Sequence, residues 1–360
     1  MRGQLCTLTT AVRALGICGP SRQLRLLPQQ AKNKPACTIT SQAPVCPFKQ
    51  HHPRHSLPRP AKNHQGVGRG RAAYTTEATV TGDPTVHGVF EPTTGTWQYV
   101  VADPATWSAV IIDPVLDFDS NTQAVGTQAA DSLLDLAANR GYKVDRILET
   151  HMHADHLTAA SYLQSRLAKE HGYRAPIGIG RRIGNLQRSF GQRYGIPAEE
   201  YEGVFDDLFG DDETFGVGMQ TAMVIHLPGH TPDHLGYKIG NNVFCGDSLF
   251  HGDIGTARCD FPGGNDVKIW TGHDYPPAGR ETAQPYMSVG DHKEQNKYFK
   301  GGVTEEQFVA MRKERDAHLA QPKLLHQSLQ MNIRAGRLPK PTETGHRMLH
   351  LPLALKGVEW

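Results

Sequence analysis

Short apolar runs rich in β-branched and aromatic residues alternate along the chain with longer segments in which apolar residues recur every three or four positions. Residues 97–103 (WQYVVAD) and 107–115 (WSAVIIDPV) show the first pattern, and the turn between them contains Pro104. Two such runs joined by a short turn indicate a β-hairpin. The folded part of the chain is therefore predicted to begin with antiparallel strands.

Strands and helices alternate after this hairpin. One helix is predicted over residues 129–141, and a second follows the segment 149–156 and ends at Gly172, with Leu157, Ala160, Leu163 and Leu167 at helical spacing. The other predicted elements are strands at 143–150, 175–180, 219–231, 234–240, 241–250 and 267–275, and helices at 181–195 and 304–319. Thr304 and Gln307 have capping-box spacing at the start of the last helix. Ionisable residues repeatedly follow the strands, which predicts an α/β fold with its chemistry along one edge of the sheets.

The 360 residues, 38% hydrophobic and 21% charged, have the composition of an ordinary globular protein. The net charge of +2 hides an asymmetry, because residues 1–76 contain twelve Lys or Arg and no acidic residue. This composition is typical of an organelle transit peptide, so we expect residues 1–74 to be a disordered mitochondrial leader. Residues 75–360 would then form a catalytic domain with a C-terminal helical tail. The alternative for the leader, a basic arm that binds nucleic acid, is disfavoured by the acidic remainder of the chain.

The number and positions of the cysteines are compatible with a mitochondrial protein. Four of the six lie in the leader, and only Cys245 and Cys259 follow it. Two cysteines are too few for a disulfide framework, which fits a reducing compartment such as the mitochondrial matrix. The leader has no long apolar stretch and is interrupted by Pro, so we expect no membrane partner.

Three histidines and an aspartate lie within six positions directly after the predicted strand 143–150. The segment reads ETHMHADH and supplies His151, His153, Asp155 and His156. Residues two apart in an extended chain project to the same side, so His151 and His153 can face one point. We expect Asp155 and His156 to lie in the first turn of the following helix, where the chain returns toward that point. Converging nitrogen and oxygen donors of this kind predict a site for a first-row transition metal.

Three further residues with metal-binding side chains follow predicted strands. His230 lies in a Pro-Gly turn (LPGHT), Asp247 follows an apolar run (FCGD) and His273 follows another (IWTGH). Each residue by itself is more simply a solvated loop group. Their order along the chain after the histidine cluster makes a shared metal centre the better interpretation.

This ordered pattern, H-x-H-x-D-H and then His, Asp and His, resembles the metallo-β-lactamase superfamily. The resemblance extends from about Thr85 to Pro352. It implies an αββα sandwich with the metal centre between the edges of two sheets. Because that fold hosts many reactions, the function has to be argued from the site.

Two segments, residues 251–264 (HGDIGTARCDFPGG) and 272–281 (GHDYPPAGRE), are similar to the mitochondrial persulfide dioxygenase group, also called ethylmalonic encephalopathy protein-like. This resemblance implies oxidation of glutathione persulfide by O2 to sulfite and glutathione, in sulfide catabolism. It also implies one Fe(II) per chain, held by His151, His230 and Asp247. Two imidazoles and one carboxylate are the ligand set of non-haem Fe(II) oxygenases, whereas Zn(II) has no redox chemistry with which to activate O2.

Arg258 is our candidate for holding the anionic substrate or a neighbouring carboxylate such as Asp260, since a guanidinium can bind such groups through two hydrogen bonds. A structural ion pair is an equally good role for it. Tyr275 is predicted to supply a nearby hydroxyl donor. Cys259 is expected to pack rather than react.

His153, Asp155, His156 and His273 support a second interpretation. In binuclear relatives such as glyoxalase II they complete two zinc positions around Asp247, where a metal-bound hydroxide cleaves a thioester. In the persulfide group they look like residues that surround a single iron. An inactive, truncated relative is the third alternative. We expect no nucleic-acid partner, and a homodimer is compatible with the sequence.

The chain departs from the family between DFPGG and VKIW, where only Asn265 and Asp266 intervene. Family members usually carry a helix there, and a crossover between parallel strands needs a dozen or more residues. Losing a helix that covers a few apolar side chains would cost about 5 to 10 kcal/mol, comparable with the stability of a domain. We therefore expect the chain to fold poorly or to displace His273.

Overall fold

The structure, a computed structural model, describes residues 74–76, 82–254, 266–298 and 300–353. The predicted leader up to residue 73, together with Arg258, Cys259 and Asp260, lies outside these ranges. Within the described residues, no helix is both long enough and apolar enough to span a bilayer.

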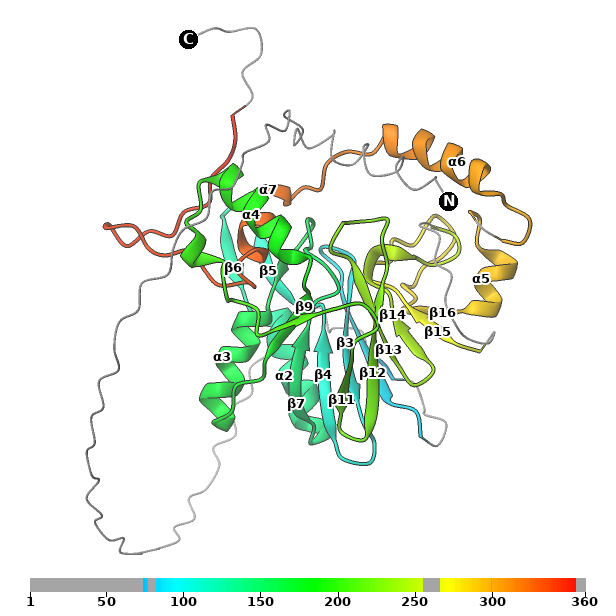
Figure 1. The fold of residues 1–360 in the computed structure, drawn as a ribbon, viewed down its shortest axis with the longest axis horizontal. Coiled ribbons are helices and arrows are strands. Elements are labelled where there is room, and N and C mark those ends of the chain that lie inside the picture. The colour runs from blue at the N-terminus through cyan, green and yellow to red at the C-terminus, as the bar shows by residue number, and fades with distance from the viewer. Residues whose placement is uncertain (1–73, 77–81, 255–265, 299, 354–360) are drawn as a thin grey trace, which may run out of the picture. The chain divides into compact units, whose positions relative to one another are not determined.

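Two β-sheets form the centre of the fold (Figure 1). The first has seven strands in the order β1-β2-β3-β4-β7-β9-β10. Its members are β1 (Tyr74–Thr76), β2 (Thr85–Glu91), β3 (Thr96–Ala102), β4 (Ser108–Ile112), β7 (Lys143–Leu148), β9 (Ile177–Gly180) and β10 (Asp207–Phe209). The strands from β1 to β4 are antiparallel, which confirms the predicted hairpin of β3 and β4, and the pairs from β4 to β10 are parallel.

The second sheet has six strands in chain order. They are β11 (Thr214–Val217), β12 (Gln220–His226), β13 (Leu235–Ile239), β14 (Asn242–Phe244), β15 (Lys268–Trp270) and β16 (Tyr286–Ser288). Only the β14–β15 pair is parallel. A small third sheet joins β6 (Ala124–Gly126), β5 (Val115–Asp119) and β8 (Leu157–Thr158).

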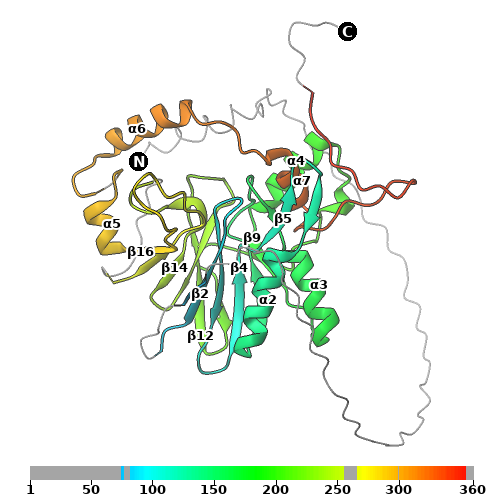
Figure 2. The ribbon, with the colours of Figure 1, turned by 180° about the vertical axis from the view of Figure 1, so that it is seen from behind.

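Helices cover the outer face of the seven-stranded sheet (Figures 1 and 2). They are α2 (Gln128–Arg140), α3 (Ala160–His171), α4 (Ile183–Tyr194) and α7 (Leu325–Asn332). The remaining helices among the described residues are α5 (Val289–Gln295), α6 (Glu305–Ala317) and the short 3-10 turns η1 (Ala198–Glu200) and η2 (Gly246–Ser248). The glycines predicted to close α2 and α3, Gly141 and Gly172, both have the left-handed conformation with φ 72°. The capping box of α6 is also present, with Thr304 and Gln307 as predicted.

Alternation along β3 builds two hydrophobic cores. Tyr99 and Val101 face the second sheet, while Val100 and Ala102 face the helices, so every residue of this strand is buried. Burial of each large apolar side chain contributes about 1.5 to 3 kcal/mol. The predicted α/β fold with two packed sheets is confirmed, because the first sheet lies between a helical layer and the second sheet.

The outer face of the second sheet has a smaller core. Six buried residues form it, together with partly buried Ile225 and Val289. Val289 begins α5, a helix of seven residues. This thin cover lies on the sheet that contains β15, the strand after the short connection.

Two predicted boundaries beside the histidine segment are wrong. The strand expected to reach His151 ends at Leu148, and the helix expected to include Asp155 and His156 begins only at Ala160. The reason is that Leu157 and Thr158 pair with β5 as strand β8, which holds the histidine segment as an irregular loop. Propensity reasoning along the chain cannot see this pairing.

The expected displacement of His273 is also wrong. The strand predicted over 241–250 ends at Phe244, so the crossover to β15 runs over residues 245–267 and satisfies the length that a parallel connection needs. Two backbone hydrogen bonds of Gly272 further fix the end of β15. The Gly272 N–H donates to the Gly246 carbonyl, and the Trp97 N–H donates to the Gly272 carbonyl, each at 2.8 Å.

Candidate metal centre

The loops at one edge of the two sheets bring together His151, His230 and Asp247. One ligand atom from each lies within 4.8 Å of the others. His151 follows β7, His230 lies between β12 and β13, and Asp247 lies in η2 after β14. His151 and Asp247 are buried, whereas the His230 side chain is 39% exposed. The sequence-predicted triad is therefore assembled in space, with one open side at His230.

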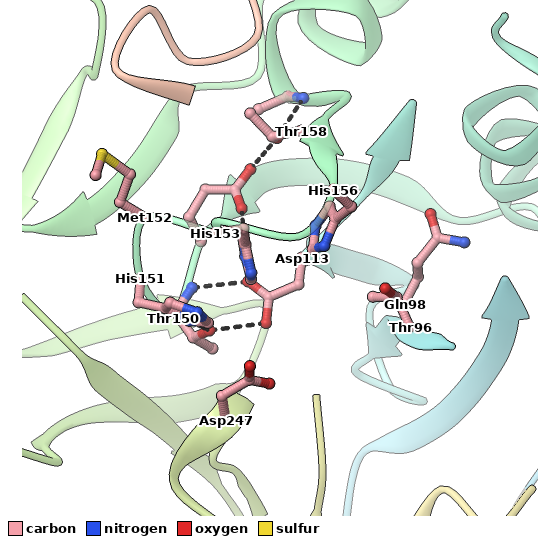
Figure 3. A network of polar contacts seen from close by, with 12 residues as sticks. Thr96, Gln98, Asp113, Thr150, His151, Met152, His153, His156, Thr158 and Asp247 are labelled. Carbon is pink, nitrogen blue, oxygen red and sulfur yellow. Dashed lines mark hydrogen bonds and ion pairs between the residues drawn. The ribbon is translucent and has the colours of Figure 1, made fainter. Parts of the chain in front are cut away.

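The orientation of His151 is fixed by its neighbour in the chain. The Thr150 hydroxyl donates to Asp113 Oδ2 (2.8 Å), so its oxygen is the acceptor for the N–H at His151 Nδ1 (3.0 Å). Figure 3 shows Asp113 close to Thr150 and His153 beneath the loop. Burial and the neighbouring imidazoles of His153, His234 and His230 hold the pKa of His151 well below 6.5. The ring is neutral, with Nε2 offering a lone pair, which is the form that binds a metal.

A second group of ligand atoms shares Asp247. Atoms of Asp155, Asp247 and His273 also lie within 4.8 Å of one another. His273 Nε2 is 3.1 Å from Asp155 Oδ2 and 3.4 Å from Asp247 Oδ1. Burial lowers the pKa of His273, but the carboxylates of Asp247 and Asp155 outweigh it and raise this pKa to about 9. His156 Nδ1 lies 3.2 Å from the same Asp155 carboxylate.

The Nε2 of His153 faces two buried carboxylates, those of Asp113 and Glu149. Its Nε2 lies 3.1 Å from Asp113 Oδ1 and 3.2 Å from Glu149 Oε2. Burial opposes a charge on this ring, but the two carboxylates outweigh burial and raise the pKa of His153 well above 6.5. The Nδ1 of His153 is left facing the cluster. Asp113 and Glu149 were not singled out in the sequence, because each is one of many acidic residues that follow a strand.

These residues fit a metal ion. Four buried atoms, His151 Nε2, His153 Nδ1, His156 Nε2 and Asp247 Oδ1, have no hydrogen-bond partner among the described residues. A buried polar atom without a partner is costly, and such atoms are rare in native proteins. Four of them on neighbouring metal-binding side chains are accounted for if they ligate a cation. Imidazoles and carboxylates suit iron and zinc alike, so the ligand types do not choose between them.

His234 is a buried residue of the centre that sequence reasoning missed. Its Nε2 accepts a hydrogen bond from the backbone N–H of Asp247 (3.1 Å), and its Nδ1 lies 3.1 Å from Ser248 Oγ. An acceptor at Nε2 means that the proton is at Nδ1, which donates to Ser248. Asp233, its neighbour, accepts from the Met152 N–H through Oδ2 (2.8 Å). The sequence did offer one signal for Asp233 and His234, because both directly precede the apolar strand β13 in the segment HTPDHLGY.

Tyr275 lies at the rim of the centre. Its ring stacks on His273 with a centroid distance of 5.7 Å and an interplanar angle of 6°, and the side chain is exposed. Its hydroxyl donates to the Thr94 carbonyl (3.3 Å). The hydroxyl that was predicted as a nearby donor is thus engaged with the backbone, and the ring of Tyr275 is its exposed part.

The motif GHDYPPAGRE has a structural basis in Arg280. Its Nη2 donates to Asp274 Oδ1 (2.7 Å) and its Nε to Asp253 Oδ2 (2.8 Å). Asp274 is buried and directly follows His273. Arg280 therefore ties the segment after His251 to the end of β15.

Comparison with known proteins gives consistent matches. The sequence model of the metallo-beta-lactamase superfamily matches residues 93–298. A beta-lactamase hydrolase-like protein of Xylella fastidiosa is 40% identical over 313 residues, covering 82% of this chain and 71% of that protein. Glyoxylase B2 of Dictyostelium discoideum is 37% identical over 279 residues, covering 72% of this chain and 93% of that protein. Among solved structures, ETHE1 from Myxococcus xanthus has a TM-score of 0.52 and 24% identity, covering 70% of this chain and 99% of its own.

Proposed function

Because the chain belongs to the metallo-beta-lactamase superfamily, we propose that it uses this metal centre as a persulfide dioxygenase. The observation that carries the proposal is the triad of His151, His230 and Asp247, with ligand atoms within 4.8 Å. The resemblance of residues 251–264 and 272–281 to persulfide dioxygenases favours iron over zinc there. Two imidazoles and one carboxylate on one side of an ion leave coordination positions for O2 and a sulfur anion.

The proposed reaction converts glutathione persulfide, O2 and water into glutathione, sulfite and protons. The outer sulfur loses the electrons that O2 gains, and the S–S bond breaks with its electron pair on the glutathione sulfur. One Fe(II), if held by the triad, would supply the redox chemistry that this step needs. The matrix location stays part of the proposal and rests on the composition of residues 1–74.

The residues around the triad have separate tasks in this proposal. Asp113, through Thr150, keeps the Nε2 of His151 available as a ligand. The exposed side of His230 is the direction from which substrate enters, and the Tyr275 ring lies at its rim beside His273. Arg258 and Asp260 lie outside the described residues, so their part in holding the anionic substrate stays a prediction.

A second candidate function is a binuclear zinc hydrolase of the glyoxalase II type. The observation in its favour is the second ligand group, in which Asp155 and His273 join Asp247. The name of the Dictyostelium relative points in the same direction. In that case two zinc ions, held by these residues, would supply the Lewis acidity and the nucleophile for hydrolysis of a thioester.

Metal analysis of the full chain, purified without added zinc, separates the two functions. The dioxygenase proposal expects about one iron per chain and sulfite as the product from glutathione persulfide. Two zinc ions per chain with cleavage of a glutathione thioester would replace it by the hydrolase. Bound metal with neither activity would identify an inactive relative.

A further inference from the structure

The last residue of α7 contacts the loop that carries four of the candidate ligands, His151, His153, Asp155 and His156. Asn332 is buried, and its Nδ2 donates to the carbonyls of His153 and His156, both at 2.8 Å. Its Oδ1 accepts from the Thr158 N–H at 2.9 Å. These partners lie more than 170 positions earlier in the chain.

An asparagine amide is well suited to this loop. It has two N–H donors and one carbonyl acceptor, and each of them finds a backbone group here. Residues 151–156 have no helix or strand in which to pair their own backbone groups. Buried backbone groups need partners, so Asn332 supplies hydrogen bonds that regular structure would supply elsewhere.

The contact also reaches the His153 ring by a second route. Thr158, whose N–H is bound by Asn332, donates its hydroxyl to Glu149 Oε1. The other oxygen of Glu149 lies 3.2 Å from His153 Nε2. The backbone and the ring of His153 are therefore both linked to Asn332.

The segment that presents Asn332 is itself fixed against this region. The N–H and the hydroxyl of Ser161 donate to the Ala335 carbonyl at 3.0 and 2.6 Å, and Gln187 Nε2 donates to the Ile333 carbonyl at 2.9 Å. Gly336 approaches so closely that a Cβ there would lie 2.2 Å from the Thr158 carbonyl oxygen. The segment directly after Asn332 is thus fixed against residues 158–161 and 187.

We propose that Asn332 is a positioning residue of the metal centre, which holds the loop of His153, Asp155 and His156 in its ligating arrangement before a metal binds. It touches neither substrate nor ion and acts through the loop backbone. The inference does not depend on iron or zinc, or on the reaction, because its contacts are the same for both. It rests only on this loop forming part of the centre.

Metal affinity of the full chain tests this role, measured by chelator competition with Fe(II) under anaerobic conditions and with Zn(II). In Asn332→Asp an oxygen faces the His153 and His156 carbonyls in place of the N–H donors. Residues that orient ligands typically change metal affinity by about 10 to 100-fold, so we expect the Kd to rise at least about tenfold. Ser328→Ala is the matched control, because Ser328 is equally buried one helical turn earlier and its hydroxyl has no hydrogen-bond partner among the described residues. Its Kd should stay within about twofold of the wild-type value.

A merely structural role gives a different result. Asn332→Asp would then lower the melting temperature of the metal-free protein while its metal Kd stayed within about twofold, and that outcome would overturn the proposal. If the variant does not fold, hydrogen exchange of the metal-free wild-type protein decides. Amides of residues 152–158 should exchange slowly without metal if Asn332 orders the loop. Exchange at the rate of an unstructured peptide would show that the metal orders the loop and would refute the inference.

Discussion

The imidazoles of His151 and His234 stack at a centroid distance of 4.6 Å with 27° between their planes. His234 thereby contacts one candidate ligand through its ring face and another, Asp247, through the hydrogen bond to its Nε2. Both of its nitrogens are occupied by groups that are not metal ions. One buried residue therefore relates the position of His151, from the first sheet, to that of Asp247, from the second.

This relationship predicts the effect of changing His234. In His234→Leu the Asp247 N–H loses its buried acceptor, so we expect metal affinity to fall by about 10 to 100-fold. His234→Gln restores an acceptor of similar reach and should recover most of the loss. Chelator competition measures both, with the half-exposed His226→Gln as control. Equal metal affinity in the leucine and glutamine variants would show that the hydrogen bond does not matter.

A glycine near Asn332 gives a prediction about stability. Gly336 and Gly345 both have a left-handed backbone, with φ of 77° and 85°, but only Gly336 has a neighbour within 4 Å of its added Cβ. Alanine at Gly345 should cost about 1 kcal/mol of unfolding free energy, the usual conformational penalty. Alanine at Gly336 adds a clash with the Thr158 carbonyl and should cost at least about 2 kcal/mol more. Urea denaturation compares the unfolding free energies of the two variants. Equal decreases would contradict the prediction, because the segments of Gly336 and Thr158 would then separate without a cost in free energy.

His292 predicts part of the acid sensitivity. It is buried on α5, and burial, with a smaller contribution from His251, lowers its pKa to about 4. Because the pKa in the folded protein is below the unfolded value of about 6.5, the folded state binds fewer protons. Its stabilising contribution is complete above pH 6.5 and is lost as the pH falls toward 4. At pH 5 the loss amounts to about 2 kcal/mol.

The variant His292→Gln isolates this contribution, because glutamine does not titrate. Unfolding free energies at pH 7 and pH 5 should differ by about 2 kcal/mol less in the variant than in the wild-type chain. An identical pH dependence of the two proteins would exclude His292 as a source of acid instability.

The thin cover of the second sheet predicts a stabilising insertion. Met223 and Ile225 on β12 are partly exposed on the face opposite the central core. A helix inserted between Gly264 and Val267, with apolar residues facing them, should raise the melting temperature of the full chain. Because both side chains are already partly buried, covering what remains exposed should be worth at most about 3 kcal/mol. A polar helix of the same length is the control, and equal melting temperatures of all three proteins would defeat the prediction.

Local signals in the sequence were sufficient for much of this structure. The helix ends at Gly141 and Gly172, the capping box at Thr304 and the hairpin of β3 and β4 all follow from neighbouring residues. The candidate ligands could also be found, because imidazoles and carboxylates in this order directly after apolar strands are rare. Short strands such as β8 and β16 could not be predicted, because a pattern of alternating apolar and polar residues cannot be recognised over two or three positions.

The supporting residues of the centre were missed for a different physical reason. Asn332 and Asp113 act through partners 174 and 37 positions away, and only the folded chain reveals such pairs. Glu149 and His234 lie close to the predicted ligands in sequence, but the sequence does not show whether a carboxylate or an imidazole is buried. The contacts that hold the ligands in place are therefore the part of a metal site that only the structure reveals.

Oxygen uptake by the iron-loaded full chain, supplied with glutathione persulfide, tests the central claim most directly. The account predicts consumption of one O2 for each sulfite formed, and loss of this activity in Asp247→Asn with metal-free stability retained. The zinc-loaded chain should consume no O2. Equal turnover with zinc alone, or thioester hydrolysis without oxygen uptake in the iron-loaded chain, would contradict the account.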